Sequence, residues 1–143
     1  LTLSRPQSAI IDSAVLTLWT TYYPYAPPVW PMDVRCHVMR RSWTEMEATW
    51  NEAREGVLWG APGADDLVVD REAAFVASSV ISAVDTPYTF NITGAVQRWV
   101  SNRGSNHGLI LIGDGNISEY RFHSAESGLV NKRPRLNLRY RVP

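Results

Sequence analysis

The sequence predicts an all-β protein, a jelly-roll-like antiparallel β-sandwich with one short helix. Many short apolar runs carry alternating or β-branched residues, glycines and prolines separate these runs, and a single segment has helical spacing. The chain has 143 residues, of which 45% are hydrophobic, so its size and composition suit one packed core. We therefore expect residues 1–143 to form a single β-sandwich domain.

Two segments near the start predict strands. Residues 11–20 are mostly apolar on both alternating faces, which is typical of a strand inside a sheet. Residues 32–41 alternate between apolar and polar types, which predicts a half-buried strand. Cys36 lies on its apolar side and is the only cysteine, so an intrachain disulfide is excluded and we expect a small buried side chain.

The middle of the chain is less regular. Residues 42–50 fit one helical turn with a sequence similar to a capping box, and glycines and prolines then mark loops. Residues 72–83 are small or β-branched, which predicts a strand interrupted at its two adjacent serines. A short strand is expected over residues 88–92.

The helix is expected over residues 93–100, with Thr93 as its N-cap. The continuous apolar run at 108–113 predicts a buried strand. Two more strands are expected, over residues 117–123 and 135–142. In the last of these, one face is expected to point to the core and the other to the solvent. The inward residues are Leu136, Leu138 and Tyr140, and the outward residues are Arg135, Asn137, Arg139 and Arg141.

Four motifs then occur in an order that resembles the DNRLRE-domain family. They are WTEMEATWN at 43–51, FNITGAVQRWV at 90–100, NHGLILIGDG at 106–115 and FHSAESGLVNKRPRLNLRY at 122–140. The resemblance implies an extracellular jelly-roll module of bacteria or archaea, and some relatives are classed as carbohydrate-binding. It also implies one or two further N-terminal strands, which are missing here. Either the sequence was cut at that point, or a strand of another chain fills the gap.

The resemblance also implies structural roles for residues within these motifs. Trp43, Trp50 and Trp99 match family positions, and we expect them to pack in the core. Asn51 belongs to the first of these motifs and is expected to be structural. Glu126 stands at a position typical of the family, and we expect it to form an ion pair with Arg133 or Arg135, with a ligand role as the alternative.

An aromatic, proline-rich segment lies outside these motifs. Residues 20–31 read TTYYPYAPPVWP and include Tyr22, Tyr23, Tyr25 and Trp30. Prolines stiffen a loop, and aromatic rings bind sugars or protein surfaces, so three roles stay open. The segment is a platform for a polysaccharide, a contact with a neighbouring protein subunit, or a lid over the end of the sandwich.

The sequence offers little catalytic chemistry. It has no zinc-hydrolase histidine pattern, no nucleophile elbow and no phosphate-binding loop. Its paired acids are close together in polar segments, where carboxylates are usually solvated. We therefore expect a protein that is not an enzyme. Calcium is the one candidate cofactor, because Asp65, Asp66, Asp114 and Asn116 are loop residues with oxygen ligands. The same residue types also form ordinary turns.

Fourteen basic residues balance fourteen acidic ones, which argues against a nucleic-acid partner, and no apolar run is long enough for membrane insertion. We expect an extracellular or cell-surface location. The expected function is a non-catalytic module that binds carbohydrate or mediates adhesion. The alternative is a structural subunit of an extracellular filament or virion, assembled by strand addition between chains.

Overall fold

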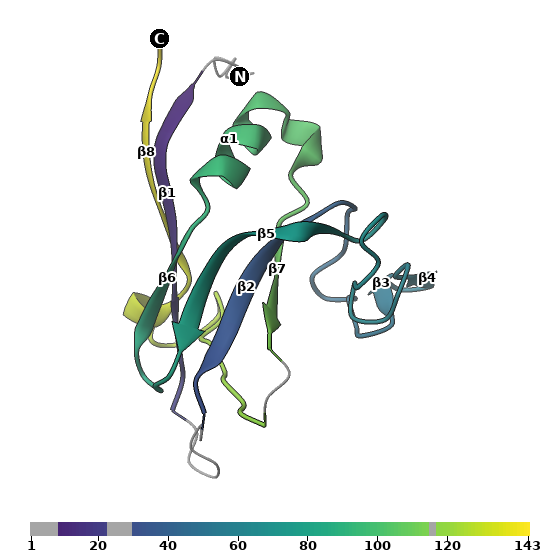
Figure 1. Ribbon diagram of the computed structural model, residues 1–143, viewed down its shortest axis with the longest axis vertical. Helices are drawn as coiled ribbons and strands as arrows, with labels where there is room; N and C mark the ends of the chain where they lie inside the picture. Colours follow the sequence, from purple (N-terminus) through teal and green to yellow (C-terminus); the bar gives the residue numbers. More distant parts are fainter. Residues whose placement is uncertain (1–8, 23–29, 115–116) are drawn as a thin grey trace.

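Two antiparallel sheets form a sandwich in the computed structural model, which describes residues 9–22, 30–114 and 117–143. The first sheet has the order β6 (Pro87–Asn91), β1 (Ile10–Trp19), β8 (Arg135–Arg141), and the second has β5 (Arg71–Ile81), β2 (Met32–Met39), β7 (Leu109–Gly113). Helix α1 (Thr93–Ser101) lies at the upper end of the sandwich (Figure 1). The predicted all-β sandwich with one short helix is confirmed.

The core fills the space between the sheets. Its largest fully buried member, Phe90 of β6, stands opposite Leu16 of β1. The predicted apolar side of β2, Val34, Cys36 and Val38, is buried in the same cluster. Cys36 is the buried hydrophobe that the sequence predicts, and burial raises the pKa of its thiol to about 12.

Strand β5 is continuous through the two serines where we expected an interruption. Two irregularities lie closer to its start. At the first, Cys36 of β2 pairs with Ala77 but the next residue of β2 pairs with Phe75, and the second lies between His37 and Met39 of β2. The extra residue, Val76, forms a bulge that bends the strand. Serine can adopt regular strand conformation, so two adjacent serines do not by themselves indicate that a strand is interrupted.

The predicted strand over residues 117–123 is wrong. Only Phe122 makes a β-bridge, with Thr20, and the rest of the segment is irregular. Tyr120 and Phe122 pack against the core, which explains the alternating pattern. The alternating sequence therefore indicates which side chains face the core. It does not indicate a strand, because most of this backbone is not hydrogen-bonded to a neighbouring strand.

Strand β8 forms where expected, but its leucines are not buried. Leu136 and Leu138 pair with Leu16 and Ala14 of β1, so they point toward the core side of the sheet. They are nevertheless 43% and 46% exposed, because β8 is the last strand of its sheet among the described residues.

The helix begins as predicted, but Thr93 is its first residue and not its N-cap. The Asn91 side-chain oxygen accepts hydrogen bonds from the backbone N–H and the hydroxyl of Thr93, at 3.2 and 2.6 Å. The Thr93 hydroxyl oxygen in turn accepts the N–H of Ala14, which fixes α1 against β1. No helix in the described part of the chain has both the length and the apolar character needed to cross a bilayer.

Residues 42–70 form a separate projection beside the second sheet, which we call the lobe (Figure 1). The lobe contains the short hairpin of β3 (Glu52–Arg54) and β4 (Val57–Leu58). The predicted helical turn is present within it as a single turn, closed by the Ala48 N–H donating to the Thr44 carbonyl. Two short 3-10 helices, η1 (Arg103–Ser105) and η2 (Val130–Lys132), complete the elements.

Asp70 holds the base of the lobe together. Its fully buried carboxylate accepts the N–H groups of Gly60, Ala61 and Asp66 at 2.9, 3.1 and 3.2 Å. Desolvation by burial raises the pKa of Asp70, but the three N–H donors and the nearby Arg41 guanidinium outweigh it and hold the pKa below its ordinary value of 3.8. The charged carboxylate is therefore the form that stabilises the lobe.

We expect Asp70→Asn to lower the free energy of unfolding by about 2–4 kcal/mol at pH 7, because an amide cannot accept all three N–H groups. Since the folded pKa is depressed, the wild-type stabilisation is complete above the ordinary pKa and is lost as the pH falls through the folded pKa. Denaturant unfolding between pH 7 and pH 2 measures both effects. The exposed Asp12→Asn is the matched control. Equal acid sensitivity of wild type and Asp70→Asn contradicts this role.

Candidate functional site

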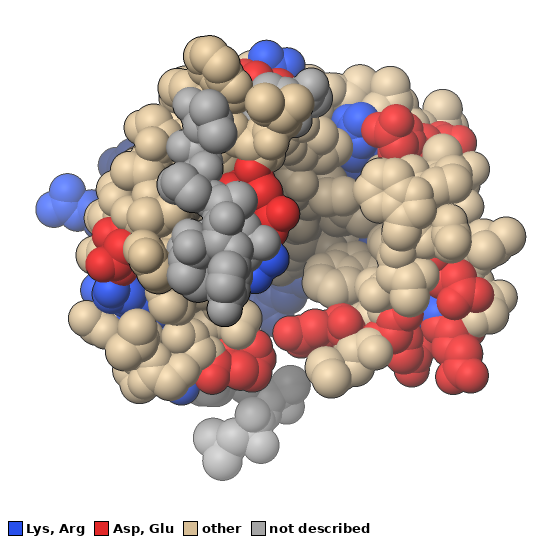
Figure 2. Space-filling model, turned by 90° about the horizontal axis from the view of Figure 1, so that it is seen from below, with Lys and Arg blue, Asp and Glu red and all other residues tan. Residues whose placement is uncertain are grey.

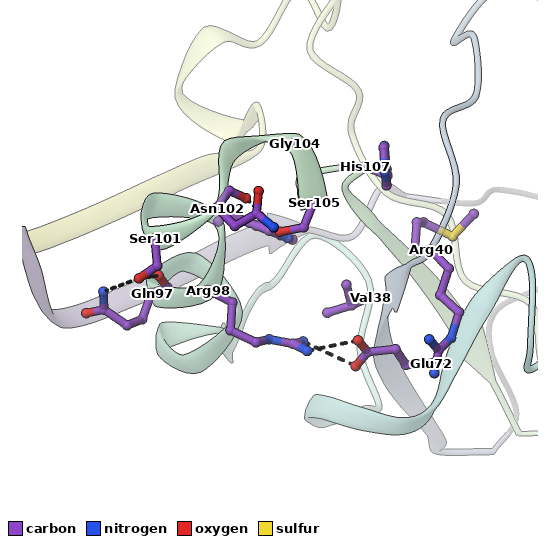
Figure 3. A pocket seen from close by; sticks show the side chains of 12 residues that line it. Val38, Arg40, Glu72, Gln97, Arg98, Ser101, Asn102, Gly104, Ser105 and His107 are labelled. Atoms are coloured by element: carbon purple, nitrogen blue, oxygen red, sulfur yellow. Dashed lines mark hydrogen bonds and ion pairs between the residues drawn. The ribbon is translucent and has the colours of Figure 1, made fainter. Parts of the chain in front are cut away.

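A pocket of about 610 Å³ lies between the α1–η1 segment and the adjoining strands β2 and β5. Its walls carry the side chains of Glu72, Arg98, Asn102, Ser105 and His107, with Trp99 supplying the aromatic surface. Figure 3 shows Arg98 extending from α1 to Glu72 on β5, with Arg40 near Glu72. The pocket thus brings together donors, acceptors and an indole ring at one end of the sandwich.

The Glu72–Arg98 pair crosses the pocket. Arg98 Nη1 donates to Glu72 Oε1 at 2.8 Å, and Nη2 donates to Oε2 at 3.2 Å (Figure 3). Two parallel hydrogen bonds fix the guanidinium and the carboxylate in one relative orientation, which a lysine ammonium group cannot do. Because Glu72 is about three-quarters buried, the pair holds its carboxylate in place while the second lone pairs remain available to a ligand.

Gln97 fixes the helix that carries this wall. Its side-chain oxygen accepts the N–H of Ile11 at 2.8 Å, and its side-chain nitrogen donates to the Ala9 carbonyl at 3.2 Å. These bonds connect α1 to the start of β1. Trp99, two residues further along α1, packs partly against the core and leaves the rest of its surface on the pocket.

Several polar groups that line the pocket have no partner among the described residues. The side-chain amide of Asn102 and the His107 ring make no hydrogen bond there. Arg40 has no carboxylate partner, although its Nε donates to the Arg71 carbonyl. The backbone carbonyl of His107 is used, because the Trp43 indole N–H donates to it at 2.8 Å. The free groups carry an excess of donors, which suits a ligand rich in oxygen acceptors.

The described part of the predicted aromatic platform lies after β1 and before β2, at the end of the sandwich away from α1 (Figure 1). Tyr22 and Trp30 are exposed there, while Tyr23 and Tyr25 lie outside the described residues. The Trp30 backbone is held by Ser118, whose hydroxyl accepts its N–H and donates to its carbonyl, both at 2.8 Å. An exposed indole on an anchored backbone is a suitable surface for stacking.

Tyr120 adds a third bond to this anchor. Its hydroxyl donates to the Trp30 carbonyl at 2.9 Å. Desolvation by burial, followed by repulsion from the nearby Tyr88, raises the pKa of Tyr120. The phenol therefore stays protonated and keeps donating throughout the neutral range.

The acids of the candidate calcium site are engaged in other contacts. Asp65 pairs with Arg71, and one carboxylate oxygen of Asp66 accepts the N–H groups of Val68 and Val69 at 2.7 and 3.0 Å. Asp114 lies at the end of β7, and Asn116 is outside the described residues. No group of three or more potential metal-ligating His, Cys, Asp or Glu side chains occurs within residues 9–22, 30–114 and 117–143. Calcium binding remains a prediction.

Two of the three tryptophans expected in the core are not there. Trp43 and Trp50 are 40% and 72% exposed, whereas Trp99 packs partly against the core as predicted. Trp50 lies over Gly63, where an added Cβ would come within 2.6 Å of the ring, and Gly63 has a φ of +77°. The exposed Asn51 contributes through its backbone, since its carbonyl accepts the Trp59 N–H at 3.0 Å. Trp50 and Asn51 therefore organise the lobe, whereas Trp43 connects it to His107 of the sandwich.

The expected ion pair of Glu126 is also absent among the described residues. Glu126 is exposed and pairs with neither Arg133 nor Arg135. Arg133 instead donates from Nε to the Ser127 carbonyl at 2.7 Å. The intervening turn residues, and not an ion pair, therefore fix the entry into β8.

No family model and no curated protein matches this chain. The resemblance to DNRLRE domains stays a prediction. The pocket was not predicted from the sequence, because Glu72 and Arg98 are 26 residues apart and no local pattern pairs them. The sequence indicated only that Arg98 lies on the predicted helix, and a single arginine does not identify the carboxylate with which it pairs.

We expect the Glu72–Arg98 pair to contribute a coupling energy of about 0.5–1 kcal/mol, because both side chains are partly exposed but their geometry is bidentate. A double-mutant cycle of Glu72→Gln and Arg98→Gln in denaturant unfolding measures it. The more exposed Glu119–Arg121 pair is the control and should couple more weakly. A coupling energy of zero for the first pair shows that the pocket wall is not held this way.

Proposed function

We propose that this protein is a non-catalytic module that binds polysaccharide in the pocket between α1 and strands β2 and β5. The supporting observation is that the side chains of Asn102 and His107, beside the fixed Glu72–Arg98 pair, have no hydrogen-bond partner among the described residues. Sugar hydroxyls both donate and accept, and the carboxylate and guanidinium offer both functions. Trp99 provides an apolar surface for a ring face.

The charge of the pocket favours an acidic saccharide. Arg40 and Arg98 line it, and Glu72 is the only carboxylate among its lining residues. Arg98 is neutralised by Glu72, which leaves Arg40 without a carboxylate partner in the described structure. A uronic acid residue would supply one, and guanidinium groups bind carboxylates with well-defined geometry.

The number of carboxylates in the pocket favours a binding role over glycoside hydrolysis. Canonical glycosidases use two carboxyl groups that face each other across the scissile bond. The lining residues of this pocket include one carboxylate, and it is already paired with Arg98. An extracellular or cell-surface location agrees with a polysaccharide ligand and belongs to the same proposal.

We expect soluble polyuronate to bind, and to bind more tightly than an uncharged glucan, in isothermal titration calorimetry. Because each lost hydrogen bond costs about 0.5–1.5 kcal/mol, Asn102→Ala combined with His107→Ala should weaken binding about tenfold. Arg40→Ala should remove the preference for polyuronate.

Trp30→Ala is the matched control at the opposite end of the sandwich and should leave the affinity unchanged. Loss of binding in Trp30→Ala with normal binding in the pocket variants would transfer the function to the aromatic segment. Failure of both polysaccharides to bind the wild-type chain contradicts the proposal.

A further inference from the structure

Strand β8 presents an apolar stripe to solvent. Leu136, Leu138 and Tyr140 lie on one face, opposite Leu16, Ala14 and Ile11 of β1. The β1 side of this face enters the core, yet Tyr140 is 62% exposed and the two leucines are nearly half exposed. Within the described structure no other strand pairs with the outer edge of β8. In the part of the chain that the structure describes, the edge of β8 is thus unpaired and its apolar face is partly exposed.

The other face of β8 is basic. Arg135, Arg139 and Arg141 alternate with the apolar stripe. Arg141 lies 3.3 Å from Asp12, in a pair that is mostly exposed, while Arg135 and Arg139 have no carboxylate partner among the described residues. An edge strand with an apolar stripe on one face and unpaired guanidinium groups on the other suits an acidic partner that covers the edge and reaches both faces.

The lobe has the complementary character. Glu45, Glu47, Glu52 and Glu55 have no cationic partner in the described part of the chain, and Arg54 is the only basic residue of the lobe. Its large exposed apolar side chains include Met46, Trp50, Leu58 and Val68. Seen from below, acidic side chains gather on the right-hand part of the molecule, which is the lobe (Figure 2).

These two surfaces cannot meet within one molecule. Figure 1 shows β8 along the left side of the sandwich and the β3–β4 lobe projecting on the right. The formal net charge is zero, so the segregated charges leave no overall repulsion between copies. The partner that offers both an acidic apolar surface to β8 and a basic apolar strand to the lobe is a second copy of this chain.

We propose that the lobe of one copy docks onto β8 of the next copy. The contact is heterologous, because the two surfaces differ, and repetition of it produces an open chain of subunits and not a closed pair. The lobe covers the edge of β8 and reaches both of its faces. Its apolar side chains contact Leu138 and Tyr140 on one face, and its glutamates lie opposite Arg135 and Arg139 on the other and set the orientation. This function goes beyond polysaccharide binding and uses none of the pocket residues.

The test is a charge exchange measured by sedimentation velocity and light scattering on the full chain. Wild type should associate as concentration rises, and added salt should weaken the association. Arg135→Glu with Arg139→Glu should be monomeric, and so should Glu45→Arg with Glu55→Arg. Both sets change exposed side chains, and circular dichroism with denaturant unfolding verifies that the fold is retained.

Mixing the two variants should restore association, because each reversed surface then faces its complement on the other chain. A chain that carries all four substitutions should also associate with itself. A wild-type chain that stays monomeric at its highest soluble concentration overturns the proposal. Association that survives both reversals, or that mixing fails to restore, overturns it as well. Normal polyuronate binding by the monomeric variants separates this result from that of the pocket.

Discussion

The buried Asp70 carboxylate determines where the lobe leaves the sandwich and where β5 begins. Three backbone N–H groups of the lobe converge on its side chain, and its own carbonyl accepts the Arg40 N–H at 2.8 Å. Arg71 and Glu72 follow directly, so the same residue sets the position of the pocket carboxylate. A charge that is costly to bury unless it is fully bonded thus links the lobe to the candidate binding site.

The two proposed activities use different parts of this arrangement. The pocket depends on the contact of α1 with β1 and β5, which Gln97 and Arg98 maintain. The docking surfaces depend on side chains that the fold leaves in solvent on β8 and on the lobe. A protein with separate ligand and assembly surfaces can lose either one without loss of the other, because no lining residue of the pocket lies on β8 or in the lobe.

Local patterns in the sequence were sufficient for most of the fold. The alternation around Val34, Cys36 and Val38 and the helical spacing before Ser101 depend on neighbours in the chain, and both were predicted correctly. Burial at an edge was not predictable, because the exposure of Leu138 depends on the strand order of the whole sheet. Trp43 and Trp50 show the same limit, since a large apolar side chain indicates a packing surface but not its location. The Glu72–Arg98 pair required the tertiary structure.

The buried thiol of Cys36 makes the folded chain chemically silent toward alkylating reagents, because attack requires both access and the thiolate form. Cys36 stands on the central strand of the second sheet, so the reagent reaches it only when the sandwich itself opens. The rate of Cys36 modification therefore measures how often the core opens, without an engineered label. Local unfolding of the lobe alone would leave that rate unchanged.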